Sequence, residues 1–289
     1  MKPLISYYGG KQKIAARIVE EIQRIPHKIY AEPFCGGCAV LYAKPEPTPS
    51  NWSNYREVIN DTNELVVNLY RAARTLPSEL HDLIELTPYS RVEYRRAVDI
   101  CKGRIEANEL EKAWALYVNT QMSFANKLNS GWGIGLTTQN LSATWEAKRQ
   151  RLKDSLSRLK RVHIDCQDAL DFIDRWDHPD ALFYCDPPYI GTECGHYSGY
   201  TAEDYQALCD KLDNIQGSYI LSNYPQEIQP DSAQTVIRIE TTMTASGKGR
   251  VRSSTAKPSE GENKRTEILW VCNRSPIKEK LQLSLLDVA

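Results

Sequence analysis

The segment Ala181-Leu182-Phe183-Tyr184-Cys185-Asp186-Pro187-Pro188-Tyr189 joins an apolar run to an acidic residue, two prolines and an aromatic residue. The run from Ala181 to Cys185 predicts a buried strand, and the prolines end it because proline has no amide hydrogen for a sheet ladder. Asp186 would then stand at the carboxyl end of this strand. Open α/β sheets bind their ligands at that edge.

The sequence on both sides of this segment alternates helical and strand patterns. Isoleucines at helical spacing from Ile14 to Ile25 predict a helix behind the turn Tyr8-Gly9-Gly10-Lys11, and Pro26 ends it. This alternation is typical of an α/β sheet. Further strands are predicted at residues 28–31, 57–59, 161–164, 218–222, 236–239 and 268–272, and further helices at 38–44 and from 65 onward.

The middle of the chain has a different pattern. Residues 72–158 show helical periodicity and loops without a convincing strand, and they include a polar stretch from Asn126 to Gly133. We therefore predict one α/β domain, residues 1–71 and 159–275, interrupted by a mostly helical insertion. A C-terminal tail, residues 276–289, follows it.

The composition is that of a globular protein. The 289 residues carry 36 Lys and Arg against 37 Asp and Glu, and 41% are hydrophobic, which excludes disorder. No window approaches about eighteen apolar residues and no secretory signal begins the chain, so we expect a cytoplasmic protein without a membrane span. The net charge of −1 argues against a uniformly basic nucleic-acid binder but permits local basic patches.

The eight cysteines are expected to be reduced thiols, because they are scattered through a chain too long to need disulfides. The one close pair, Cys35 and Cys38, has the spacing of a redox or zinc motif. A structural zinc would need two more ligands at similar spacing, and the sequence has neither a second such pair nor a suitable histidine pair. We therefore predict no metal site.

The four residues from Asp186 to Tyr189 suit the binding of a planar group that bears an exocyclic amine. A carboxylate and a backbone carbonyl that proline leaves unpaired can accept its two N–H bonds, and an aromatic ring can stack on it. The alternative is a surface turn, which proline after an acidic residue also favours. The preceding buried strand argues against that alternative.

With four other motifs in the same order, this segment makes the chain resemble the Dam-like DNA adenine-N6 methyltransferases. The resemblance covers most of the chain. It implies a Rossmann-like methyltransferase sheet with an inserted helical target-recognition domain, S-adenosylmethionine as cofactor, and methyl transfer to the N6 amine of adenine in double-stranded DNA. The other motifs are Tyr7-Tyr8-Gly9-Gly10-Lys11, Glu32-Pro33-Phe34-Cys35-Gly36-Gly37-Cys38, Asn60-Asp61, and an acid at a strand end, best matched by Asp168.

The resemblance also assigns the site residues. It makes Asp186, Pro187, Pro188 and Tyr189 catalytic. It makes residues 1–71 and 159–275 the cofactor-binding catalytic domain and residues 72–158 the DNA-binding domain. The cofactor-binding residues would be Tyr7, Lys11, Glu32, Phe34, Gly36, Gly37, Asp61, Asp168 and Asp186.

Several of these residues have a structural alternative. Glu32 could cap the following turn, and Asp61 could cap a helix that begins at Thr62. Lys11 could be a solvated surface lysine. It follows Gly-Gly at a predicted helix start, where a cation gains nothing from the helix dipole, so we expect it to have a partner across the site.

Two positions are less regular. The family usually has glycine where this chain has Cys38; cysteine is small, so we expect cofactor binding to survive, with a change in loop geometry as the open question. Asp165 and Asp171 lie near Asp168 and compete with it for the role of contacting the cofactor's adenine.

The resemblance implies direct transfer without a covalent intermediate, so Cys185 needs no catalytic role. Asp186 and the Pro187 carbonyl would each accept a hydrogen bond from the amine. Both would oppose the positive charge that develops on its nitrogen. The target adenine has to leave the duplex, and Tyr189 would stack on it.

DNA binding is expected from local patches. Residues 146–161 hold seven Lys and Arg against two acids, which is either a DNA-facing patch or a solvated helix face. Residues 248–265 form a second basic run, predicted to be a loop that orders on phosphates. Residues 123–133 would contact bases, with Phe124 or Trp132 filling the gap left by the flipped base unless they belong to the core. The predicted DNA-binding residues are Phe124, Asn126, Lys127, Trp132, Lys248, Arg250, Arg252, Lys264 and Arg265.

The C-terminal tail contains a separate motif. Gln282, Leu283, Leu285 and Leu286 resemble the pentapeptide that binds the bacterial sliding clamp, which would fit a bacterial or phage-encoded enzyme. A helix packed on the core would explain the leucines equally well. Exposed terminal apolar side chains otherwise need a partner.

Two other functions remain compatible with these residues. The acceptor could be another planar amine, such as an RNA adenine or the N4 amine of cytosine. From a different class, the chain could be a catalytically silent DNA-binding module. The intact Lys11, Asp61 and Asp186 argue against the silent module.

Overall fold

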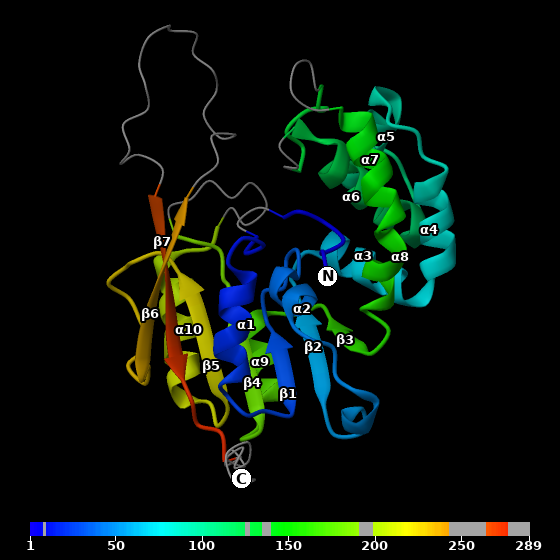
Figure 1. The fold of residues 1–289 in the computed structure, drawn as a ribbon. Helices are drawn as coiled ribbons and strands as arrows, with labels where there is room; N and C mark the ends of the chain where they lie inside the picture. Colours follow the sequence, from blue (N-terminus) through cyan, green and yellow to red (C-terminus); the bar gives the residue numbers. More distant parts are fainter. Residues whose placement is uncertain (8–9, 125–127, 135–139, 191–198, 243–263, 277–289) are drawn as a thin grey trace, which may run out of the picture.

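The computed structural model describes residues 1–7, 10–124, 128–134, 140–190, 199–242 and 264–276 (Figure 1). Its centre is one seven-stranded sheet in the order β3-β2-β1-β4-β5-β7-β6. All seven strand positions predicted from the sequence are confirmed. The strands are β1 Ile29–Glu32, β2 Arg56–Asn60, β3 Val162–Asp165, β4 Ala181–Cys185, β5 Ser218–Asn223, β6 Thr235–Thr242 and β7 Lys264–Cys272.

The first five strands run parallel. β1 pairs with β2 on one side and with β4 on the other, so the order of connection reverses between β1 and β4. β3 extends the sheet beyond β2, and β5 extends it beyond β4. A reversal of this kind opens a ligand-binding crevice at the carboxyl ends of the two central strands. Glu32 and Asp186 come from those two strand ends.

The last two strands run against the others. β7 lies antiparallel to β5 and to β6, and Ile268 is paired with Asn223. Because of this direction, the amino-terminal half of β7 lies beside the carboxyl end of β5. Residues near Arg265 and Glu267 therefore reach the edge at which the parallel strands end (Figure 1).

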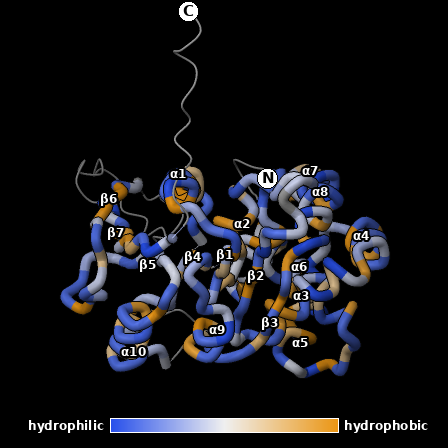
Figure 2. The backbone as a smooth tube through the Cα atoms, turned by 90° about the horizontal axis from the view of Figure 1, so that it is seen from below, coloured by the Kyte–Doolittle hydropathy of each residue, from blue (hydrophilic) through white to orange (hydrophobic). Residues whose placement is uncertain are grey.

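The two sheet faces bury alternate residues of each strand, as the pleat requires. Tyr30, Leu182 and Tyr184 belong to the apolar cluster that includes α1 Ala15–Gln23, α2 Ala39–Ala43 and α3 Glu64–Thr75. Ala31 and Phe183 belong to the cluster that includes α9 Ala169–Trp176 and α10 Ala202–Asn214. Figure 2 shows α9 and α10 on one side of the strands and α1 and α2 on the other.

The helical insertion packs against α3. Its central helix α6 has every residue from Ala113 to Met122 buried, and α6 contacts both α3 and α5. The insertion shares one continuous apolar cluster with the first face of the sheet. Its helices are α4 Pro77–Glu85, α5 Arg91–Cys101, α6 Glu109–Met122, α7 Leu141–Gln150 and α8 Leu152–Ser157, and a short 3-10 helix, η1 Pro49–Asn51, lies earlier in the chain.

Local signals account for the helix boundaries. Asn108 and Glu111 form a reciprocal capping box at the start of α6, and Thr201 and Asp204 form another at α10. Asn63 caps α3, so the alternative that Asp61 is the helix cap is wrong.

Seven of the eight cysteines lie within the described residues, and these are free thiols. None of the described helices is long and apolar enough to cross a membrane.

Candidate active site

Asn60 ties together three loops at the carboxyl edge of the sheet. Its side-chain nitrogen donates to the Pro33 carbonyl at 3.0 Å and to the Gln167 carbonyl at 3.0 Å. The Gln167 amide donates back to Asn60 Oδ1 at 2.9 Å, and the Cys35 amide donates to the Asn60 carbonyl at 2.9 Å. The loops that follow β1, β2 and β3 are thus held side by side by one fully buried amide.

The glycine loop after β1 is fixed by the strand beside it. Gly36 has φ +44°, and its amide donates to Asp61 Oδ2 at 2.8 Å. Asp61 Oδ1 accepts the Asn63 amide at 2.9 Å, so both carboxylate oxygens hold backbone. The Tyr70 hydroxyl donates to the Gly36 carbonyl at 2.7 Å. Two buried side chains, Asp61 and Tyr70, therefore hold this loop in place.

Tyr7 packs directly on this loop. A Cβ atom added at Gly36 would lie 3.0 Å from Tyr7 Cδ1, and one added at Gly37 would lie 3.1 Å from Tyr7 Cβ. The Tyr7 hydroxyl accepts a hydrogen bond from Asn63 at 3.1 Å. A side chain at either position would require Tyr7 to shift by a few tenths of an ångström, and at Gly36 it would also be strained by the positive φ. The N-terminal segment is thereby held over the strand ends.

Cys38 adopts the left-handed conformation that the family's glycine would favour, with φ 53° and ψ 33°. A non-glycine residue pays roughly 1 kcal/mol or more for this backbone. Cys38 is fully buried, and its amide still closes the turn onto the Cys35 carbonyl at 2.6 Å. The loop geometry is therefore that of a left-handed turn, with cysteine bearing the strain that glycine would not.

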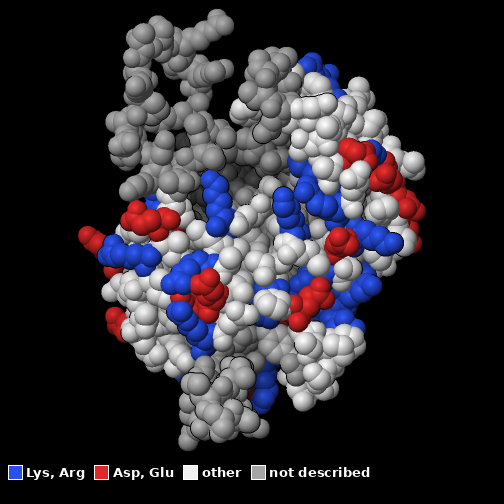
Figure 3. Space-filling model, in the orientation of Figure 1, with Lys and Arg blue, Asp and Glu red and all other residues white. Residues whose placement is uncertain are grey.

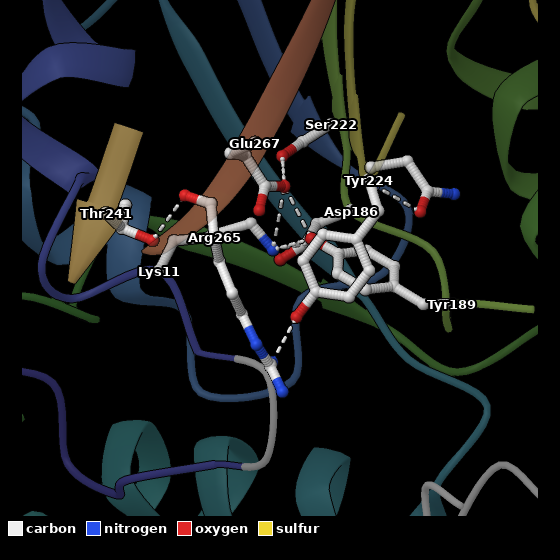
Figure 4. A network of polar contacts seen from close by, with 9 residues as sticks. Lys11, Asp186, Tyr189, Ser222, Tyr224, Thr241, Arg265 and Glu267 are labelled. Carbon is white, nitrogen blue, oxygen red and sulfur yellow. Dashed lines mark hydrogen bonds and ion pairs between the residues drawn. The ribbon is translucent and has the colours of Figure 1, made fainter. Parts of the chain in front are cut away.

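Lys11 and Asp186 meet across the site although 175 residues separate them in the chain. Lys11 Nζ donates to Asp186 Oδ1 at 2.6 Å and also to the Tyr189 hydroxyl. Lys11 is only 6% exposed, so the alternative of a solvated surface lysine is wrong, and the expected partner across the site is Asp186. Figure 4 shows the three side chains converging.

Glu267 completes this network and was missed by the sequence reasoning. Its Oε1 accepts the Ser222 hydroxyl at 2.6 Å and the Tyr189 hydroxyl at 2.5 Å, and it lies 3.5 Å from Lys11 Nζ (Figure 4). Glu267 is 6% exposed. The available signal was a single acid directly before the apolar run of the last strand, Ile268 to Cys272.

A second tyrosine, Tyr224, lies against Tyr189. The rings of Tyr189 and Tyr224 are 4.3 Å apart and meet edge to face. Arg265 contacts the Tyr224 hydroxyl, and its guanidinium lies 5.4 Å from the Tyr224 ring centre. Arg265 is exposed at this edge, so the structure brings one predicted DNA-binding residue next to the network around Asp186.

A family model described as D12 class N6 adenine-specific DNA methyltransferase matches residues 7–237. The chain belongs to this family. It is 25% identical over 248 residues to the type II methyltransferase M.MjaIII of Methanocaldococcus jannaschii, covering 77% of this chain and 84% of that protein. It is 21% identical over 219 residues to the retron Ec67 DNA adenine methylase of Escherichia coli, covering 74% and 73%.

Among solved structures, the rRNA methyltransferase AviRa of Streptomyces viridochromogenes aligns with a TM-score of 0.36 and 11% identity. That alignment covers 91% of this chain and 85% of AviRa.

The burial of charge in this D12 methyltransferase shifts the pKa values of Asp186 and Lys11. Burial raises the pKa of Asp186 to about 6, with Lys11 opposing the rise and Glu267 adding to it. Burial alone would lower the pKa of Lys11, but Asp186 and Glu267 together raise it above its ordinary value. Near neutral pH the site therefore combines an ionised Asp186 with a protonated Lys11.

Two other predicted cofactor residues have structural partners. Glu32 is 2% exposed and accepts hydrogen bonds from the Tyr30 hydroxyl, at 2.7 Å, and from the backbone of Leu41; burial raises its pKa to about 7. Phe34 packs edge to face on Tyr200 at 6.3 Å. The contact with Leu41 holds the first turn of α2 rather than the turn that follows β1, and the cofactor role of Glu32 stays a prediction.

Asp168 lies at the start of α9. Its Oδ1 accepts the Leu170 amide at 2.8 Å as the helix cap, and the side chain is exposed. Because Asn60 holds the neighbouring Gln167, Asp168 lies on a loop fixed beside the glycine loop. Its contact with the cofactor's adenine stays a prediction.

Phe124 and Trp132, the two aromatic residues predicted to fill the gap in DNA, have different environments in the structure. Trp132 packs against the Tyr89 ring at 5.5 Å and lies under the Arg91 guanidinium at 4.9 Å, so it belongs to the insertion's own packing. Phe124 is 60% exposed, on a short hairpin in which its amide donates to the Gly131 carbonyl at 2.7 Å. Of the pair, Phe124 is the side chain available to DNA.

The basic run at residues 146–161 is not a continuous DNA-facing patch. Arg158 is 3% exposed and forms a two-pronged ion pair with Glu57, at 2.6 Å and 2.8 Å. Lys148 donates to the Gln121 carbonyl at 2.7 Å, and burial lowers its pKa to about 8. Arg149 contacts Glu146 and the Glu85 carbonyl. Three of the seven basic residues are thus used within the molecule, whereas Arg151, Lys153, Lys160 and Arg161 are exposed, and contact of these four with DNA stays a prediction.

Figure 3 shows Lys and Arg interspersed with Asp and Glu on the face it displays. The remaining predicted contacts lie outside the described residues or have undescribed side chains. The backbone of Lys264 is described as the first residue of β7, paired with Thr242. Outside the described residues are the predicted DNA-binding Asn126, Lys127, Lys248, Arg250 and Arg252 and the predicted clamp-binding Gln282, Leu283, Leu285 and Leu286.

Proposed function

We propose that this D12 methyltransferase transfers the methyl group of S-adenosylmethionine to the N6 amine of an adenine extruded from duplex DNA. The observation that carries the proposal is the position of Asp186 directly after β4, next to the glycine loop that follows β1. β1 and β4 are neighbouring parallel strands. A methyl donor held at one strand end and an amine held at the other would meet at this edge.

The residues at this edge suit S-adenosylmethionine. Gly36 and Gly37 present backbone without side chains, and Tyr7 and Asp61 fix that backbone from two sides. Asp61 and Asp168 offer carboxylate oxygens for ribose hydroxyls and the adenine amine, and a carboxylate can accept more than the backbone bonds it already has. The cofactor, when bound, supplies an electrophilic methyl group.

Asp186 has one oxygen suited to the acceptor amine. Its Oδ1 takes the contacts with Lys11 and Tyr189, while none of the described residues hydrogen-bonds to its Oδ2. We assign Oδ2 as the hydrogen-bond acceptor for one N–H group of the amine and the Pro187 carbonyl as the acceptor for the other. Both acceptors draw the nitrogen toward tetrahedral geometry and oppose the positive charge that develops on it.

The adenine has to leave the helix to reach Asp186, because the amine is stacked and paired inside a duplex. We assign Phe124 to the gap, and its exposure on the helical insertion supports this. Arg265, exposed beside Tyr224, is placed to contact phosphate near the extruded nucleotide.

The assay that tests this function uses tritiated S-adenosylmethionine with duplex DNA of mixed sequence. Digestion to nucleosides should recover the label in N6-methyladenine. Matched RNA serves as the second substrate. Label recovered in N4-methylcytosine or in RNA would replace the proposal with another acceptor, and no transfer to any substrate would favour a silent DNA-binding module.

The pH dependence of turnover should show an acid limb. Protonation of Asp186 removes the charge that opposes the developing cation, and its pKa is raised to about 6. We expect kcat to fall about tenfold per pH unit below that value and to level off above it. Turnover measured from about pH 5 to about pH 8 checks this. Cofactor affinity measured at the same pH values is the control, and a flat profile would contradict the assignment.

Replacing Gly36 by alanine should weaken cofactor binding. The new Cβ would lie 3.0 Å from the Tyr7 ring at a left-handed position. We expect affinity for S-adenosylmethionine to fall by about tenfold or more, measured by calorimetry. Gly103→Ala is the matched control, because Gly103 has φ +67° but nothing within 4 Å of an added Cβ. Equal affinity in both variants would show that the close approach is not needed for binding.

A further inference from the structure

Glu267 puts a second buried carboxylate beside the catalytic one. It comes from β7, the strand inserted antiparallel next to β5, and it reaches the network because that strand runs opposite to the others. Lys11 Nζ lies 2.6 Å from Asp186 and 3.5 Å from Glu267. With both carboxylates ionised, one ammonium faces two negative charges in a buried site.

The contacts of Glu267 are directed at the catalytic groups. Its Oε1 receives the Tyr189 hydroxyl at 2.5 Å, while that hydroxyl lies 3.3 Å from Asp186 Oδ1. The hydroxyl of Ser222, on β5, donates to the same Glu267 oxygen at 2.6 Å. A carboxylate held by a buried donor cannot turn away from Tyr189 without breaking a charged hydrogen bond.

We propose that Glu267 is a positioning residue for methyl transfer, which holds the Tyr189 hydroxyl and shares the Lys11 ammonium so that the buried cluster presents a net negative charge to the amine. The proposal deepens the proposed function and rests on it. If Asp186 alone faced Lys11, the pair would be close to neutral. Asp186 would then oppose a developing positive charge less strongly.

The electrostatic surroundings are set by several elements. Lys11 comes from the N-terminal segment, Tyr184 from β4, and Asp186 and Tyr189 follow it. Glu32 comes from β1, and Tyr224 follows β5. Arg265 and Glu267 come from β7. Lys11 lowers the pKa of Asp186 and Glu267 raises it, so removing either changes the titration of the same group.

The test compares Glu267→Gln with the parent protein. Glutamine keeps the shape and an acceptor for Tyr189 but loses the charge. We expect kcat to fall about tenfold to a hundredfold while KM for S-adenosylmethionine changes less than about twofold. The acid limb of kcat should move to lower pH, because a negative neighbour of Asp186 has gone.

Tyr189→Phe provides an independent measurement. It keeps the ring and removes the hydroxyl, whose hydrogen bond lowers the pKa of Asp186. The acid limb should therefore move to higher pH, opposite to the shift in Glu267→Gln. If Glu267→Gln does not fold, Glu267→Asp takes its place: the shorter side chain keeps the charge but draws the carboxylate away from the Tyr189 hydroxyl, now at 2.5 Å, and should lower kcat with little change in KM for the cofactor, whereas parental kcat would overturn the proposal.

Glu240→Gln is the matched control. Glu240 lies on β6 opposite Thr266, next to Glu267 in the same strand pair, but its side chain is exposed. It removes the same charge from the same hairpin and should leave both kcat and the acid limb unchanged. A Glu267→Gln protein whose acid limb stays at the parent position overturns the proposal, whatever its turnover. The proposed function would still stand if the parent protein methylates adenine and Asp186→Ala does not.

Discussion

Asp186→Ala should abolish most methyl transfer while leaving the cofactor bound. The substitution removes the carboxylate that faces the amine, together with the acceptor for Lys11 at 2.6 Å. Loss of a preorganised group that stabilises developing charge costs about a hundredfold to a thousandfold in kcat. Lys11 would remain close to Glu267, so the alanine protein keeps a partner for its buried ammonium.

Single-turnover transfer of tritiated methyl to DNA measures this effect, with cofactor affinity determined on the same preparation. Asp186→Asn should retain more turnover than Asp186→Ala, because the amide oxygen still accepts an N–H bond but has no charge. Asp180→Ala is the control at the opposite end of β4, where Asp180 pairs with Lys28. Turnover of Asp186→Ala within about tenfold of the parent would refute the mechanism.

Arg158→Ala should destabilise the fold far more than it weakens DNA binding. Arg158 and Glu57 are both 3% exposed, and the guanidinium also donates to the Leu41 carbonyl at 3.0 Å. Removing one partner leaves the Glu57 carboxylate buried with Lys44 alone, at 3.0 Å. We expect the free energy of unfolding to fall by about 3 to 5 kcal/mol.

Urea unfolding followed by circular dichroism checks this value. Lys153→Ala on α8 is the matched control, because Lys153 belongs to the same basic run but is exposed. Its unfolding free energy should change by no more than about 0.5 kcal/mol. If Arg158→Ala instead kept its stability and lost DNA affinity, the buried ion pair would not describe the role of Arg158.

The sequence by itself determined the order of the strands and the position of the segment from Asp186 to Tyr189 at a strand end. These are local properties: a run as short as Ala181 to Cys185, followed at once by two prolines, favours a buried strand over a helix, and the prolines end that strand. Placing Asp186 at the carboxyl edge follows from the strand direction. The same reasoning supported the glycine loop after the strand at Ile29–Glu32.

Only the tertiary structure decided which distant side chains meet. Lys11 and Glu267 reach Asp186 because the N-terminal segment is docked on the glycine loop and because β7 runs antiparallel to β5. Neither fact has a local signature. The same holds for Arg158, whose charge looks like part of a DNA-binding run until Glu57, 101 residues away in the chain, is placed beside it.

The distinction between Phe124 and Trp132 is of this kind too. Both are aromatic residues of one polar stretch, and either could contact DNA or the core. Packing decided it, because Tyr89 and Arg91 cover Trp132 and leave Phe124 exposed. Neighbouring residues along the chain determine the secondary structure. The environment of a side chain depends instead on which distant residues the fold packs against it.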